Sequence, residues 1–153
     1  MMATSKQQLP DFVSLYRRYQ ILADDGSFRS QLGKRVSAPE ELGTRPAFYR
    51  LFPGERPPIW GERIAFFLPW CTHSDDGKSL GQQLASAGVS EVRLFQVVRA
   101  ESPNDLIQLR RLLQHVEPVV NWQHFGTQLF YWNERTKRTL LEDFCIHQTV
   151  KTK

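Results

Sequence analysis

The segment LIQLRRLLQHVEP, residues 106–118, constrains the fold more than any other part of the chain. Its apolar residues recur at the three- and four-residue spacing of one helical face. They are Leu106, Leu109, Leu112, Leu113 and Val116. Such a stripe needs other elements to cover it, because a helix with one apolar face is stabilised mainly by packing. The segment therefore predicts an amphipathic helix with a buried face.

Helical patterns also dominate the rest of the sequence, and no segment alternates apolar and polar residues for long enough to predict a convincing strand. We therefore expect an all-α protein, a compact bundle of about seven to nine helices. A length of 153 residues fits a single helical domain over residues 1–153, with two small helical subdomains divided near residues 74–90 as the alternative. The expected buried residues are Leu109, Leu112, Leu113, Val116, Phe95 and Phe144.

Local signals mark where helices begin. Ser37 and Glu40 have the spacing of a capping box, and Pro46 suits the first position of the helix PAFYRLF. Ser102 is expected to cap the helix that carries the apolar stripe, and Asn121 the helix NWQHFGTQLFYW. Prolines and glycines crowd together in FPGERPPIWGER, which predicts a loop over residues 52–63 before a buried helix through IAFFLPW.

The charge balance permits an anionic partner without requiring one. The net charge is +4 and the pI is near 9.3, and 14 of the 20 basic residues are arginine. The planar guanidinium matches phosphate oxygens better than an ammonium does, although a bias toward arginine codons would produce the same composition.

Most of the basic residues have no acidic residue three or four positions away, so a partner has to be distant or external. Among them are Arg17, Arg18, Lys34, Arg35, Arg50, Arg93, Arg99, Arg110, Arg111 and Arg135. Arg111, Arg93 and Arg135 are expected to project outward most clearly and suit phosphate best. Arg99 lies beside the Leu94 face, which favours a salt bridge to another helix, and Arg110 could lay its methylene groups over the edge of the core. Arg138 is the contrast, because Glu134 and Glu142 flank it at four residues.

Metal and catalytic chemistry have little support in the sequence. Cys71-Thr72-His73 and Cys145-Ile146-His147 repeat a C-x-H spacing, but residues two apart on a helix point about 200° away from each other and cannot chelate one ion. We expect neither a disulfide nor a metal at these cysteines, and no cofactor. No catalytic motif is present, and Glu142-Asp143 favours salt bridges over catalysis.

The polar start MMATSKQQLP lacks the apolar segment of a secretory signal. The longest apolar run, IAFFLPWC at residues 64–71, is far shorter than the roughly 20 residues of a membrane helix. These features predict a cytoplasmic protein in a reducing environment that has no membrane partner.

Several blocks of the sequence are familiar when they are taken together: RPAFYRL at residues 45–51, RLFQVVRA at 93–100, QLRRLLQHVEPVVNW at 108–122 and LLEDF at 140–144. With LYRRYQ near the start and SLGQQLASAG in the middle, they resemble the CasB family, the small subunit of the type I-E CRISPR surveillance complex Cascade. The blocks follow the family's order over most of the chain. Residues 52–78 do not match the pattern, and nothing is carried over there.

The resemblance implies an all-helical, non-enzymatic subunit that acts in antiviral defence and is present in two copies in its complex. It would contact the backbone and large subunits and hold guide RNA, target DNA or the displaced strand. By the same resemblance, nine basic residues are candidates for nucleic-acid contacts: Lys34, Arg35, Arg50, Arg93, Arg99, Arg110, Arg111, Arg135 and Lys137. Arg110 and Arg111 would then both touch phosphate.

A rival hypothesis is a protein-interaction adaptor whose arginines dock an acidic protein partner. Ile107, expected to be exposed beside Arg111, would suit such an interface. Nucleic-acid affinity that falls steeply with salt would distinguish the two hypotheses.

Overall fold

The computed structural model describes residues 8–151, and the side chains as far as residue 148. It contains nine α-helices and two short 3-10 helices within that range, which confirms the all-α expectation. The helices are α1 (Phe12–Leu22), α2 (Gly26–Leu32), η1 (Pro39–Thr44), α3 (Pro46–Arg50), α4 (Gly61–Ala65), η2 (Leu68–Trp70), α5 (Leu80–Ser86), α6 (Glu91–Arg99), α7 (Asn104–Val116), α8 (Trp122–Phe130) and α9 (Glu134–Lys151). Two strands of two residues each, β1 (Thr72–His73) and β2 (Val119–Val120), pair in parallel.

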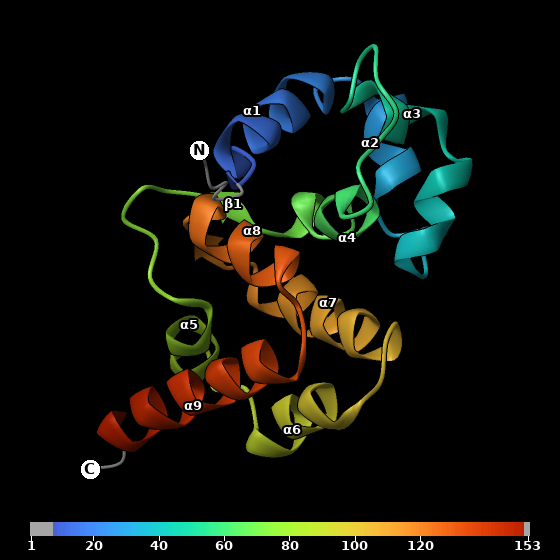
Figure 1. Cartoon of the computed structure of the whole chain (residues 1–153). Helices are drawn as coiled ribbons and strands as arrows, with labels where there is room; N and C mark the ends of the chain where they lie inside the picture. The colour runs from blue at the N-terminus through green and yellow to red at the C-terminus, as the bar shows by residue number, and fades with distance from the viewer. Residues whose placement is uncertain (1–7, 152–153) are drawn as a thin grey trace, which may run out of the picture.

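The helices form two groups that α7 and α8 connect (Figure 1). The N-terminal elements α1 to α4 lie together, while α5, α6 and α9 lie at the other end of the molecule. The chain passes from β1 to α5 through the segment in which a subdivision was expected. The buried apolar side chains nevertheless form one cluster that extends from Phe12 in α1 to Phe144 in α9. A division into two folding units stays a prediction.

The apolar stripe of residues 106–116 lies where the sequence predicted it. Leu106, Leu109, Leu112 and Leu113 are buried in α7, and Val116 is partly buried against the same core. Phe144 of α9 is fully buried, as expected.

The expectation for Phe95 was wrong, because its side chain is 47% exposed. Helix α6 is held against the core through Leu94 and Val97, three residues apart on one face. Phe95 follows Leu94 directly and is therefore turned about 100° around the helix, out of that face.

The predicted helix caps are partly confirmed. Asn121 caps α8 with its side-chain oxygen, which accepts the N–H groups of Gln123 and His124. Ser102 does not cap α7, which begins after Pro103 without a side-chain cap. The predicted capping box is also wrong, since Ala38 precedes the 3-10 helix η1 and the N–H of Ser37 donates to Glu41 instead.

Candidate nucleic-acid interface

Lys137 is one of two predicted contact residues that the structure buries. Its Nζ lies 2.9 Å from Oδ2 of Asp105 and donates to the carbonyl of Ala100 at 2.8 Å. The same Oδ2 accepts the indole N–H of Trp132 at 2.9 Å, while Oδ1 accepts the N–H of Leu106. Asp105 and Lys137 are 2% and 4% exposed. The ammonium therefore joins α9 to α7 inside the protein, and its position does not fit a contact with phosphate.

Arg110 is the second predicted contact residue that is buried, with only 6% of its surface exposed. Its guanidinium carbon lies 4.1 Å from the centre of the Phe66 ring and 6.0 Å from that of Trp70. Its Nε and Nη1 find no hydrogen-bond partner among the described residues. Burial lowers the pKa of Arg110, and the charge of Glu41 acts in the opposite direction. The sequence placed Arg110 at the edge of the core, but α7 carries it inside, against an aromatic ring.

Arg111 occupies the next position on α7 and is exposed. The adjacent arginines, which were expected to share one role, are separated by the turn of the helix, about 100° per residue. Arg111 is one of seven predicted contact residues that lie at the surface. The others are Lys34, Arg35, Arg50, Arg93, Arg99 and Arg135.

Three of these seven residues lie in the N-terminal group, two of them just after α2. Lys34 and Arg35 line an open hollow of about 420 Å³ together with Arg29. Arg29 is already engaged, because its Nη1 donates to the carbonyl of Ala23 just after α1. Arg50, at the end of neighbouring α3, is also exposed.

The other exposed candidates lie on α6, α7 and α9. Arg99 does not form the expected salt bridge between helices, since its guanidinium carbon lies 5.3 Å from the ring centre of Phe95 on its own helix. Among the residues whose side chains are described, none of the seven candidates forms an ion pair. Arg138 likewise forms no ion pair with Glu134 or Glu142 in this part of the chain, so the local pairing expected for it is wrong.

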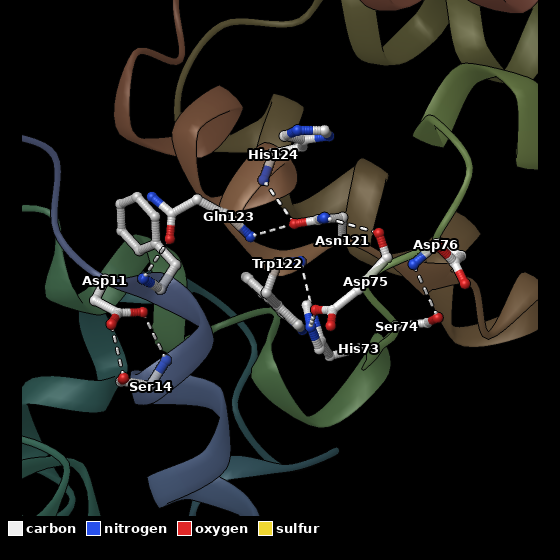
Figure 2. A network of polar contacts seen from close by, with 11 residues as sticks. Asp11, Ser14, His73, Ser74, Asp75, Asp76, Asn121, Trp122, Gln123 and His124 are labelled. Carbon is white, nitrogen blue, oxygen red and sulfur yellow. Dashed lines mark hydrogen bonds and ion pairs between the residues drawn. The ribbon is translucent and has the colours of Figure 1, made fainter.

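The first C-x-H segment has a structural role in the polar network that joins β1 to α8 (Figure 2). The Nδ1 of His73 accepts the N–H of Trp122 at 3.0 Å, and its Nε2 lies 2.9 Å from a carboxylate oxygen of Asp75. Because Nδ1 accepts, Nε2 carries the proton and donates to Asp75. The indole N–H of Trp122 donates to the carbonyl of Cys71 at 2.9 Å. Both ring nitrogens of His73 are therefore occupied by contacts within the chain.

Both cysteines are free, Cys71 being buried and Cys145 exposed. Burial raises the pKa of the Cys71 thiol, which disfavours the thiolate that a metal ion or a nucleophilic reaction would need. The described residues contain no group of three or more His, Cys, Asp or Glu side chains that could hold a metal ion. Among the same residues, no helix combines the length and apolar character needed to cross a bilayer.

These observations define the class of protein: a small helical protein whose surface is distinguished by exposed basic side chains without acidic partners. The chain belongs to the family of the CRISPR-associated protein Cse2, whose family model matches residues 27–144. This confirms the resemblance seen in the sequence blocks.

Two known proteins support the same assignment. The chain is 40% identical to the CRISPR system Cascade subunit CasB of Escherichia coli strain K12, over 89% of this chain and 93% of that protein. It also resembles a chain in the crystal structure of E. coli Cascade bound to a PAM-containing dsDNA target, with a TM-score of 0.82 and 41% identity. That match covers 92% of this chain and 99% of the other.

Proposed function

We propose that the chain is a non-catalytic structural subunit of a type I-E Cascade complex that holds nucleic acid through sequence-independent contacts with phosphate. Its partners are the backbone and large subunits, guide RNA, target DNA and a second copy of itself, and it acts in the cytoplasm. The observation that carries the proposal is its similarity, over nearly the whole length of both chains, to a protein found in Cascade bound to a dsDNA target.

The surface chemistry supports the second part of the proposal. The seven exposed candidates are distributed over both groups of helices and the connecting helix α7, and none of them is neutralised by an ion pair with a described side chain. Arginines on rigid helices suit contacts that ignore sequence, because phosphate oxygens recur at every nucleotide. Arg110 and Lys137 are excluded from the proposed interface by their burial.

Such contacts contribute to the energetics of strand exchange although they read no base. The exchange of a DNA duplex for an RNA–DNA heteroduplex is nearly balanced, so contacts with the backbone of a strand can tip the equilibrium. A subunit that shares this work with its neighbours needs only a modest net charge, here +4.

The test is the salt dependence of nucleic-acid binding by the purified chain and by Arg111→Ala. If Arg111 neutralises one phosphate, the slope of log affinity against log salt flattens by roughly 0.7 to 0.9, equally for unrelated sequences. Stability should change by less than about 0.5 kcal/mol, because Arg111 is exposed. Reconstitution of a guide-loaded complex with each variant extends the test to R-loop formation.

Arg56→Ala is the matched control. Arg56 is also exposed and forms no ion pair with a described side chain, but it lies in the proline-rich loop outside the matching sequence blocks. We expect this variant to keep the wild-type slope. Equal slopes for the two variants would contradict the assignment of Arg111 to phosphate.

The adaptor hypothesis loses its specific support, because Ile107 is partly buried and packs against the core. It would regain support if the wild-type chain bound nucleic acid weakly at every salt concentration.

A further inference from the structure

Helix α6 exposes two large apolar side chains to solvent, and one of them, Phe95, was expected to be buried. Phe95 is 47% exposed and Val92 is 64% exposed, while Leu94 and Val97 hold the helix against the core. The fold therefore does not need the Phe95 ring as a fully buried side chain. An exposed aromatic ring on a rigid helix offers a flat apolar surface on which a ligand can pack.

The ring lies in a shallow groove between α6 and α9. Val92 and Phe95 line it from α6, Leu141 and Cys145 from α9, and Glu91 is the acidic residue of the lining. Its volume is about 270 Å³, slightly below the roughly 300 Å³ at which small-molecule pockets usually begin. This size suits one planar group rather than a helix or a folded segment.

A cation accompanies the ring. The guanidinium carbon of Arg99 lies 5.3 Å from the ring centre of Phe95, one helical turn further along α6. Arg99 is exposed and forms no ion pair with a described side chain, and Arg93 is exposed on the same helix. Proteins that bind single-stranded nucleic acids combine aromatic rings, on which bases stack, with nearby cations that contact the phosphate backbone.

We propose that Phe95 and Arg99 form a stacking platform for an unpaired nucleobase of a single strand. The base stacks on the exposed part of the Phe95 ring, which accepts any base because every base has a flat π-face. The adjacent phosphate pairs with Arg99. The proposal rests on the proposed function and sharpens it, because a platform for bases favours a single strand over a duplex, whose bases are already stacked.

The experiment compares the full-length chain with Phe95→Leu, which keeps an apolar side chain of good helix propensity but removes the ring. The probes are a thymine oligonucleotide carrying one 2-aminopurine and a duplex of the same length. We expect Phe95→Leu to lose about tenfold in affinity for the single strand, within the range known for one stacked base. Its affinity for the duplex should stay within about twofold, and the 2-aminopurine fluorescence change seen with wild type should disappear.

Two further variants keep the test decisive. Phe95→Tyr retains a ring and should bind and quench like wild type, so it separates stacking from any general damage to α6. Val92→Thr removes apolar surface from the same groove without touching the ring, and should bind the single strand like wild type. A loss equal to that of Phe95→Leu would overturn the platform and indicate a groove that docks a protein.

The two proposals fail in different ways. If wild type binds no nucleic acid, both the proposed function and the platform are wrong. If wild type binds with a steep salt dependence but Phe95→Leu binds the single strand equally well, the platform alone is wrong. The platform alone is also wrong if Phe95→Leu lowers the affinity for the single strand and for the duplex equally.

Discussion

The basic residues of two regions carry the same charge but meet opposite surroundings. At the junction of α7 and α9, Lys137 is paired with Asp105 inside the protein, and nearby on α7 Arg110 stacks on Phe66. At the end of α2, Lys34 and Arg35 line a hollow that is open to solvent. Arg110, Lys34 and Arg35 lack an acidic residue three or four positions away. Lys137 has Glu134 three positions away but pairs with the distant Asp105 instead. Local sequence therefore does not distinguish a structural cation from one that is available to a ligand.

The largest expected effect tests the buried region. Lys137→Ala leaves Asp105 buried without its cation, and breaking a buried pair from one side typically costs about 3–5 kcal/mol. Urea denaturation of the purified chain measures this loss, which should depend little on salt because buried pairs are poorly screened. Lys34→Ala is the control and should change stability by less than about 0.5 kcal/mol. A Lys137→Ala variant of normal stability would remove the contrast between the two regions.

Arg110 offers the next largest effect. Arg110→Ala removes both the methylene packing and the contact with the Phe66 ring, and we expect a loss of about 2 kcal/mol. Arg110→Met keeps the volume and removes donors that lack partners among the described residues, so its stability should lie within about 1 kcal/mol of wild type. Thermal or urea unfolding measures the stability of the two Arg110 variants. If Arg110→Met were as unstable as Arg110→Ala, the charge rather than the packing would be essential.

Asp11 sharpens the comparison, because it is an exposed charge with a structural role. Its carboxylate caps α1 by accepting the N–H and the hydroxyl of Ser14, and the backbone hydrogen bond is the main cause that lowers the pKa of Asp11 below 3.8. Asp11→Ala should cost about 1 kcal/mol at neutral pH.

The pH dependence of that contribution has a definite sign. A lowered folded-state pKa means that the unfolded chain binds the proton more readily, so stability rises with pH in this range. The contribution is complete above the ordinary pKa near 3.8 and is lost as the pH falls through the lower folded value. Asp11→Asn keeps a capping oxygen and should remove this pH dependence. Acid titration of the free energy of unfolding measures it, and an unchanged profile would contradict the capping role.

The smallest effect on stability is expected for the open hollow. Lys34→Ala combined with Arg35→Ala should change the free energy of unfolding by less than about 1 kcal/mol, since both side chains are exposed. If each contacts one phosphate, the salt dependence of binding flattens by roughly 1.4 to 1.8. A stability loss similar to that of Lys137→Ala would show that the two regions do not differ as proposed.

The sequence predicted best what depends on neighbouring residues along the chain. The spacing of Leu106, Leu109 and Leu113 identified α7 and its buried face, and Asn121 identified the start of α8. The prediction failed at Ser102, which does not cap α7. Asp105, in the first turn of the same helix, accepts hydrogen bonds from Lys137 and Trp132 inside the protein. Such partners, 32 and 27 residues away in the chain, lie beyond any local pattern.

The sequence by itself therefore determined the helical class, the family and most helix positions, because periodicity, caps and the order of the sequence blocks are properties of the chain read in order. Only the tertiary structure decided which cations are available to a ligand. It buried Arg110 and Lys137, left Arg111 exposed and turned Phe95 toward solvent. The physical reason is that solvent exposure depends on how one helix is rotated against its neighbours, and that rotation is set by the packing of residues far apart in the sequence.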